Sequence, residues 1–403
     1  MDTRSYTDFS IASAIYITKY TGIWLPRNVS EEWQRKISIS YMAFALVFGL
    51  YLNVVDIFHI WGNATQTMFV ILNTMCISMT IIKMLILNFN RAKLADAFSY
   101  AQRHFWHDNY NYEEQLIFSI SVKYCTRLIF FAFAVQPVTL AGYVITPIIE
   151  NLGRNKSDRV LPFKMWLDLP LSETPYYELM FTFQVIDIFL IGVAYVCPDV
   201  FLCVFNLHVM GQFRILQHRM LNFWNVEGKE MTAFIYTDHC YAALKKCIQH
   251  HQLVIEFCVK LEQVYTMSIL VHMAFLSMLM GLDCYEIFVA DTNLSMRLIF
   301  IFHVIGSLIH LFIFTYTCHF MMEESTNVSR TIYSGSWSTL PMYKAGRSLR
   351  SDIRLIMIRS LKPCYLTAGG FFPVSLETFT TLLSSTFSYF TLMRESLIRT
   401  EGE

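Results

Sequence analysis

The chain has 403 residues, of which 55 % are hydrophobic, 16 % are aromatic and only 15 % are charged. Soluble domains carry roughly 25 % charged residues, so this composition argues against a soluble enzyme. The 31 basic and 31 acidic residues leave no net charge. The chain therefore lacks the excess of basic residues that is typical of nucleic-acid binding.

A helix that crosses a bilayer needs about 20 mostly apolar residues. By that measure the sequence predicts seven spans, at residues 37–60, 66–88, 126–148, 183–208, 264–289, 297–322 and 374–394. The residues before the first span lack the basic region and the small-residue cleavage site of a signal peptide. We therefore expect an all-α membrane protein with seven transmembrane helices, a lipid bilayer around it and a cytoplasmic amino terminus.

Loop charges test this orientation, because Lys and Arg near span ends accumulate on the cytoplasmic side. With the amino terminus inside, 22 of the Lys and Arg residues fall in cytoplasmic segments and 7 in outer segments. Seven spans then place the carboxyl terminus outside, which is the reverse of a G-protein-coupled receptor. The sequence also lacks the acidic-Arg-aromatic triplet after span three and the Asn-Pro-x-x-Tyr motif of that class.

Five Asn-x-Ser/Thr sequons bear on the same orientation. Three of them fall one in each predicted outer loop, at Asn63, Asn155 and Asn293, and these are the predicted glycosylation sites. All ten cysteines lie in predicted spans or cytoplasmic segments, so none is placed for an extracellular disulfide.

The fourth and sixth loops are too long to be simple turns. Residues 240–263 and 347–360 have amphipathic, helix-compatible patterns, so spans four, five and six are predicted to continue into the cytoplasm as a helical bundle. Pro363 and Pro373, with Gly369 and Gly370 between them, are expected to break helicity just before the last span. The final element is therefore predicted to be split into a cytoplasmic half and a membrane half.

Motifs for catalysis are not found. His250 and His251, and the pair Cys240 and Cys247, lack the spacing of a four-ligand metal site, and we interpret them as an exposed helix face or core. The sequence has no glycine-rich phosphate loop, no Gly-x-Ser-x-Gly elbow and no His-Glu-x-x-His helix. We expect no catalytic residue, no metal and no cofactor.

The last span is unusually rich in hydroxyls, since nine of the 21 residues from Val374 to Arg394 are Ser or Thr. Three- and four-residue steps place seven residues on one helix face: Glu377, Thr381, Ser384, Ser385, Ser388, Leu392 and Glu395. This face suits a water-filled cation path that an apolar ring at Leu392 closes by dewetting. It also suits close helix packing through small residues, and the pattern leaves both interpretations open. A pore would need several subunits around an axis.

The tail resembles a known signature. Residues 359–379, RSLKPCYLTAGGFFPVSLETF, followed by SYFTL at 388–392, resemble the carboxyl-terminal signature of insect odorant receptors. The resemblance extends more weakly along the whole chain in length, span number and orientation, with a familiar GIWLP segment at 22–26. It implies a ligand-gated, non-selective cation channel, formed with the odorant co-receptor (Orco) as a heterotetramer in the plasma membrane of olfactory sensory neuron dendrites.

The fourth loop lacks the long insertion expected of the co-receptor, so the resemblance implies the ligand-tuning subunit. It divides one membrane domain, 1–403, into a cytoplasmic head (1–36), spans one to six (37–322), a cytoplasmic anchor segment (323–372) and a pore helix (373–397). It places the gate at Leu392 and the outer polar ring at Glu395 and Ser396. With the stripe, the predicted pore and gate residues are Thr381, Ser385, Ser388, Leu392, Glu395 and Ser396.

The resemblance further implies an odorant pocket in the outer half of spans two to six. The residues at those depths are Phe69, Asn73, Gln136, Thr139, Tyr143, Phe183, Asp187, Leu190, Tyr195, Met280 and Phe302. A small volatile ligand would be recognised there by shape and dispersion, although each residue also fits ordinary helix packing. Lys83, Asp187 and Asp199 are costly in lipid and must face protein or water. Lining the pocket, pairing and folding all remain open for these three.

The expected mechanism has two steps. An odorant binds the open arrangement more tightly than the closed one, because only differential affinity shifts the equilibrium. Spans five and six then move the pore helix and withdraw Leu392 from the axis. The competing classes are a seven-helix receptor that signals through a G protein, a gustatory-type receptor channel and a transporter.

Overall fold

The computed structural model describes residues 9–23, 26, 28–62, 64–106, 109–155, 158–166, 170–224, 233–289, 294–335, 337 and 344–401. Within these residues the chain forms helices and one short hairpin, with the following bounds: α1 Phe9–Thr21, α2 Val29–Ile60, α3 Ala64–Phe89, α4 Arg91–His104, α5 Tyr112–Glu150, α6 Tyr176–Asn222, α7 Ala233–Phe288, α8 Leu294–Ser334, α9 Lys344–Ser360, β1 Thr367–Ala368, β2 Phe372–Pro373 and α10 Leu376–Glu401. The fold is all-α, as the sequence predicts.

Six helices are long and apolar enough to cross a membrane, namely α2, α3, α5, α6, α7 and α8. They contain the first six predicted spans. The seventh predicted span corresponds to α10, which the many Ser and Thr residues make too polar to join those six. Two further helices, α1 and α4, fall in segments that were not predicted to be helical.

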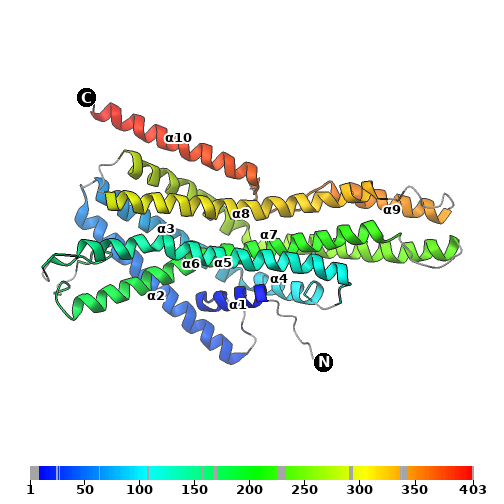
Figure 1. Ribbon diagram of the computed structural model, residues 1–403, viewed down its shortest axis with the longest axis horizontal. Coiled ribbons are helices and arrows are strands. Elements are labelled where there is room, and N and C mark those ends of the chain that lie inside the picture. Colours follow the sequence, from blue (N-terminus) through cyan, green and yellow to red (C-terminus); the bar gives the residue numbers. More distant parts are fainter. Residues whose placement is uncertain are drawn as a thin grey trace.

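The three longest helices reach well beyond a bilayer. Helices α6, α7 and α8 contain 47, 56 and 41 residues, so at 1.5 Å per residue they extend roughly 60–85 Å against a hydrocarbon core of about 30 Å. Figure 1 shows them running side by side along the long axis of the molecule, and α9 packs beside the far end of α8. The predicted helical continuation of spans four, five and six is confirmed.

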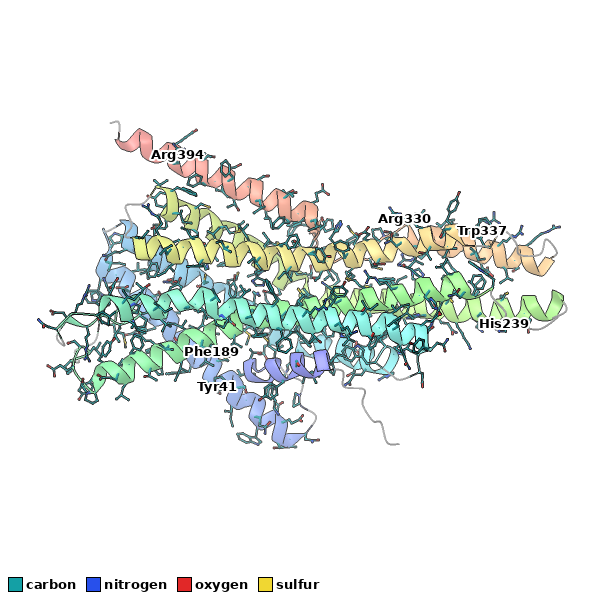
Figure 2. All side chains as sticks on the ribbon, viewed as in Figure 1. Tyr41, Phe189, His239, Arg330, Trp337 and Arg394 are labelled. Atoms are coloured by element: carbon teal, nitrogen blue, oxygen red, sulfur yellow. The ribbon has the colours of Figure 1, made fainter. Side chains whose placement is uncertain are left out.

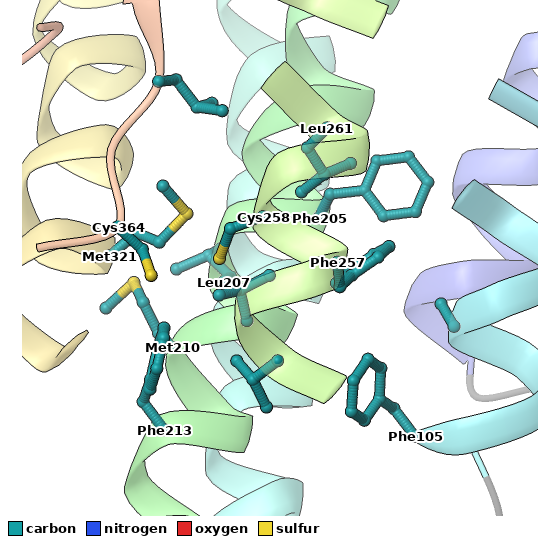
Figure 3. Close-up of a cluster of buried hydrophobic side chains, with 14 of the residues drawn as sticks. Phe105, Phe205, Leu207, Met210, Phe213, Phe257, Cys258, Leu261, Met321 and Cys364 are labelled. Carbon is teal, nitrogen blue, oxygen red and sulfur yellow. The ribbon is translucent and has the colours of Figure 1, made fainter. Parts of the chain in front are cut away.

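The core lies along α6. Every residue from 197 to 213 is buried, which is the pattern of a helix surrounded by others. Figure 3 shows part of this packing, in which Phe205 of α6 lies beside Phe257 and Leu261 of α7, and Phe213 of α6 lies near Met210. This shared core fixes α6, α7 and α8 as one body, and the shorter helices attach to it.

The break before the last helix is confirmed. Strands β1 and β2 form an antiparallel hairpin whose turn holds Gly369 and Gly370 at φ +61° and +80°. The hairpin is tied to α7: the Thr367 backbone N–H donates to a Glu262 carboxylate oxygen at 2.8 Å, and the Gly369 N–H donates to the Thr266 carbonyl at 2.9 Å. Helix α10 starts from this hairpin and runs obliquely away from the bundle (Figure 1).

The hairpin turn offers a matched pair of substitutions. A Cβ at position 369 would lie 2.7 Å from Cδ2 of Leu270, whereas a Cβ at position 370 meets nothing within 4 Å. Both glycines have positive φ, so an alanine at either site strains the backbone by about 1 kcal/mol. We expect Gly369→Ala to cost roughly 1–3 kcal/mol more than Gly370→Ala, because only the former overpacks against α7. Thermal unfolding of the two purified variants measures the difference, and equal melting temperatures would contradict the docked hairpin.

Candidate functional site

A cavity of about 180 Å³ lies between α2, α3, α5, α6 and α8. Its wall is mostly apolar, with Leu52, Ile77, Val135, Ile188 and Ile191 among its residues. Helix α2 contributes to the wall and α7 does not, so the cavity differs from the predicted pocket among spans two to six. The wall helices approach each other closely at Gly49 and Gly192. A Cβ at either position would collide with side chains of the neighbouring helices.

Five of the predicted pocket residues line this cavity: Asn73, Gln136, Tyr143, Asp187 and Tyr195. The Tyr143 hydroxyl donates to the Asn73 side-chain oxygen at 3.0 Å, which joins α5 to α3 across the wall.

The other predicted pocket residues lie elsewhere. Phe69 lines an adjoining cavity of about 210 Å³, which shares Tyr143 with the first. Phe183 packs against Phe48, with ring centroids 5.1 Å apart. Met280 is buried in the main core, whereas Leu190 is half-buried and Phe302 exposed. The side chain of Thr139 lies outside the described residues.

Most of the wall was not predicted, and three of these residues, Phe163, His303 and His310, have polar or aromatic side chains of particular interest. Phe163 comes from the segment between α5 and α6, and Gln184 fixes it by accepting from its N–H at 2.9 Å and donating to its carbonyl at 3.0 Å. Its ring lies 6.1 Å from that of Tyr143. His303 and His310 come from α8. Hydropathy gives no signal for a loop residue that folds into a cavity, whereas the two histidines in an apolar span were visible in the sequence.

A cluster of charged and histidine side chains adjoins the cavity. The Lys83 ammonium of α3 forms an ion pair with the Asp199 carboxylate of α6, and Nε2 of His310 lies 3.1 Å from the same carboxylate. Nδ1 of His272 lies 3.4 Å from Lys83 Nζ and 3.4 Å from that carboxylate. Asp199, His272 and His310 are close enough together to share a metal ion, but the ammonium already occupies the Asp199 oxygen and opposes a second cation. We therefore interpret the cluster as a buried ion pair.

The acidic residues near the cavity differ in their partners. Asp199 pairs with Lys83, and the Asp283 carboxylate lies 2.6 Å from Nδ1 of His303. Asp187 is only 6 % exposed and lines the cavity, yet it has no hydrogen bond or ion pair to any described residue. Lys83 and Asp199 therefore pair with each other, whereas Asp187 lines the cavity without a partner among the described residues.

The last helix has two contrasting faces. One face packs against α7 and α8: the Phe379 ring lies 5.7 Å from that of Phe312, the Phe390 ring lies 5.8 Å from that of Phe288, and Thr386 is buried. The opposite face carries the hydroxyl stripe. Thr381, Ser388, Leu392 and Glu395 are exposed and Ser385 is half-buried, while the Ser396 side chain lies outside the described residues.

The stripe hydroxyls bond to their own helix. Thr381, Ser385 and Ser388 each donate to the carbonyl four residues earlier, at 2.9 Å. This leaves their oxygens able to accept from water while meeting their donor requirement locally. Of the predicted glycosylation sites, Asn155 is exposed, and Asn63 and Asn293 lie outside the described residues.

The six long apolar helices define a multi-span helical membrane protein, and its helices enclose a mostly apolar cavity. The family profile described as 7tm Odorant receptor matches residues 61–387. The chain therefore belongs to the odorant receptor family. Receptors with this fold are not known enzymes.

Individual relatives agree with this assignment. The chain is 27 % identical over 238 residues to odorant receptor Or2 of Anopheles gambiae, which covers 59 % of this chain and 61 % of that protein. It is 23 % identical over 345 residues to odorant receptor 10 of Aedes albopictus, covering 84 % and 87 %. Its fold is similar to that of the olfactory receptor OR5 of Machilis hrabei solved with eugenol, with a TM-score of 0.76, 14 % identity and coverage of 96 % and 97 %.

The buried ion pair can be tested by removing one partner or both. Lys83→Met leaves the Asp199 charge uncompensated, so we expect a loss of about 3–5 kcal/mol in the free energy of unfolding. Lys83→Met with Asp199→Leu removes both charges and is expected to recover most of that loss. Thermal unfolding and surface expression measure both. As a control, Arg159→Met breaks the exposed 3.0 Å pair with Glu178 and should cost no more than about 1 kcal/mol. A double variant as unstable as the single one would contradict the pairing.

Proposed function

We propose that this chain is the ligand-tuning subunit of an odorant-gated, non-selective cation channel, which it forms with the odorant co-receptor in a heterotetramer. The proposal places it in the plasma membrane of olfactory sensory neuron dendrites. The observation that supports it best is the hydroxyl stripe of α10, which faces away from α7 and α8. Membership of the odorant receptor family does not favour the G-protein, gustatory or transporter alternatives.

The two faces of α10 support a pore. Its apolar face is already covered by α7 and α8, whereas most of the hydroxyl stripe is exposed among the residues that the structure describes. Hydroxyls and the Glu395 carboxylate are poorly suited to lipid, and one helix cannot enclose water by itself. Several such helices around an axis would line a polar path, with Leu392 as the apolar constriction that closes it.

The cavity supports a volatile ligand. An apolar cavity of about 150 Å³ is known to hold a benzene molecule, so the 180 Å³ here fits a molecule of similar or slightly larger size. The mostly aliphatic and aromatic wall provides recognition by shape and dispersion. The receptor OR5, which has a similar fold, was solved in complex with the small molecule eugenol.

The cavity and the proposed pore helix are connected through the shared core of α6, α7 and α8. Helices α6 and α8 line the cavity and share a core with α7. The α7 residues Glu262 and Thr266 hold the hairpin from which α10 starts. We infer that a ligand favouring one arrangement of α6 and α8 would displace the hairpin and, through it, the axis-facing residues of α10.

The proposed orientation puts the α9 end in the cytoplasm. Figure 2 shows His239 and Trp337 near one end of the long axis and Arg394 near the other. The two predicted cytoplasmic segments that reach toward the His239 end, the fourth and the sixth, carry 13 of the 31 Lys and Arg residues, whereas the predicted outer segments carry 7. The exposed sequon at Asn155 would then face outward.

Recordings from excised patches without GTP test the channel and its gate together. Cells expressing this chain with the co-receptor should give volatile-evoked current in such patches, because no G protein is needed. Leu392→Ser should raise the unstimulated current several-fold, since a hydroxyl at the constriction holds water there. Phe387→Ala is the matched control, because Phe387 is 68 % exposed, like Leu392 at 69 %, but lies off the stripe.

Two results would contradict the proposal. Evoked current that disappears without GTP would favour the G-protein class. Equal unstimulated currents in Leu392→Ser, Phe387→Ala and the unmodified channel would remove Leu392 from the gate.

A further inference from the structure

We propose that the cavity selects small volatiles that carry a hydroxyl group, and that this hydroxyl pairs with the Asp187 carboxyl group. The inference rests on the proposed function of the cavity as an odorant site. It adds a chemical class to a site whose wall otherwise distinguishes ligands by shape.

Asp187 is the reason for the class. Its side chain is 94 % buried and lines the cavity from α6. Among the described residues it has neither a hydrogen-bond partner nor an ion-pair partner. A buried carboxyl group without a partner costs free energy in proportion to its lost hydration. A ligand group that forms a hydrogen bond with the carboxyl group offsets that cost. Ligands that carry such a group should therefore bind more tightly.

The other charged groups around the cavity are already paired. Lys83 contacts Asp199, and His303 contacts Asp283. On the opposing helix, Asp187 faces Gly49: a Cβ at that position would come within 3.3 Å of the carboxylate oxygen. The lack of a side chain at Gly49 therefore lets α2 approach the carboxyl group closely, where any other residue would crowd it.

A hydroxyl fits this group better than the alternatives. An ionised carboxylate only accepts hydrogen bonds, and a protonated one also donates; a hydroxyl can do both, so it pairs with either form. An ether or ester has no donor for the carboxylate, and a carboxylic acid would repel it when both are ionised. An ammonium group would lose its hydration shell on entering an otherwise apolar cavity, which costs far more than for a neutral hydroxyl.

Binding by the purified full-length chain in nanodiscs tests the inference separately from channel current. Ligand binding raises the melting temperature as the ligand concentration exceeds its dissociation constant, so a titration gives that constant. The probes are benzyl alcohol and benzyl methyl ether, which share a ring and differ in the hydroxyl donor. The preference is the ratio of the dissociation constant of the ether to that of the alcohol. This ratio should be at least about tenfold larger in the unmodified chain than in Asp187→Leu.

Three variants separate recognition from structure. Asp187→Leu should abolish the preference without lowering the melting temperature of the ligand-free chain, because it replaces an unpaired buried carboxyl group with an apolar one. Asp187→Asn keeps an acceptor oxygen but adds an N–H donor from which the ether can accept, so it should retain only part of the preference. Ser307→Ala removes another polar group of the wall and should leave the preference unchanged.

Several outcomes would overturn the inference. These are an equal preference in the unmodified and Asp187→Leu chains, no binding of either probe, or a loss of the preference in Ser307→Ala. An Asp187→Leu chain that fails to fold would also overturn it, since the carboxyl group would then have a structural role. None of these results bears on the channel proposal, which is decided by current from a wider panel of volatiles.

Discussion

The last helix can bury only one of its two faces within its own chain. Phe379, Thr386 and Phe390 meet α7 and α8, and the hydroxyl stripe points away from them. A polar face next to a bilayer must find water or protein. This constraint underlies the proposed assembly, in which several copies of such a helix surround an aqueous path.

The rest of the fold can be understood as the support for that helix. The long helices α6, α7 and α8 share one core, and α6 and α8 also line the cavity. The hairpin bonded to Glu262 and Thr266 is the point at which this body holds the start of α10. Among the buried polar groups, the Lys83 and Asp199 pair joins α3 to α6, and Asp187 borders the cavity.

Hydropathy predicts where the helices lie because the bilayer imposes both length and composition. It located six long helices and, with the prolines and glycines at 363–373, the break before α10. It could not predict that β1 and β2 dock on α7, since hairpin docking is a tertiary contact. It also gave no sign of α4, an amphipathic helix that is not apolar enough to resemble a span.

The candidate site was less predictable for a related reason. Spacing tells which residues share a helix face but not which neighbouring helix that face meets. The stripe on α10 needed only its own helix, so its composition was readable. The cavity combines five helices with Phe163, and its wall depends on how they are rotated. The partners of Lys83, Asp187 and Asp199 were therefore undecidable before the fold was known.

Water accessibility along α10 tests the central claim most directly. Single cysteines placed at Thr381 and Ser388 on the stripe, and at Leu383 on the covered face, can be exposed to a water-soluble thiol reagent in cells that also express the co-receptor. The described native cysteines are buried or half-buried, which limits the background. The account predicts rapid modification at the stripe positions during volatile stimulation and slow modification at Leu383. Stripe positions as unreactive as Leu383 would show that this face does not border water.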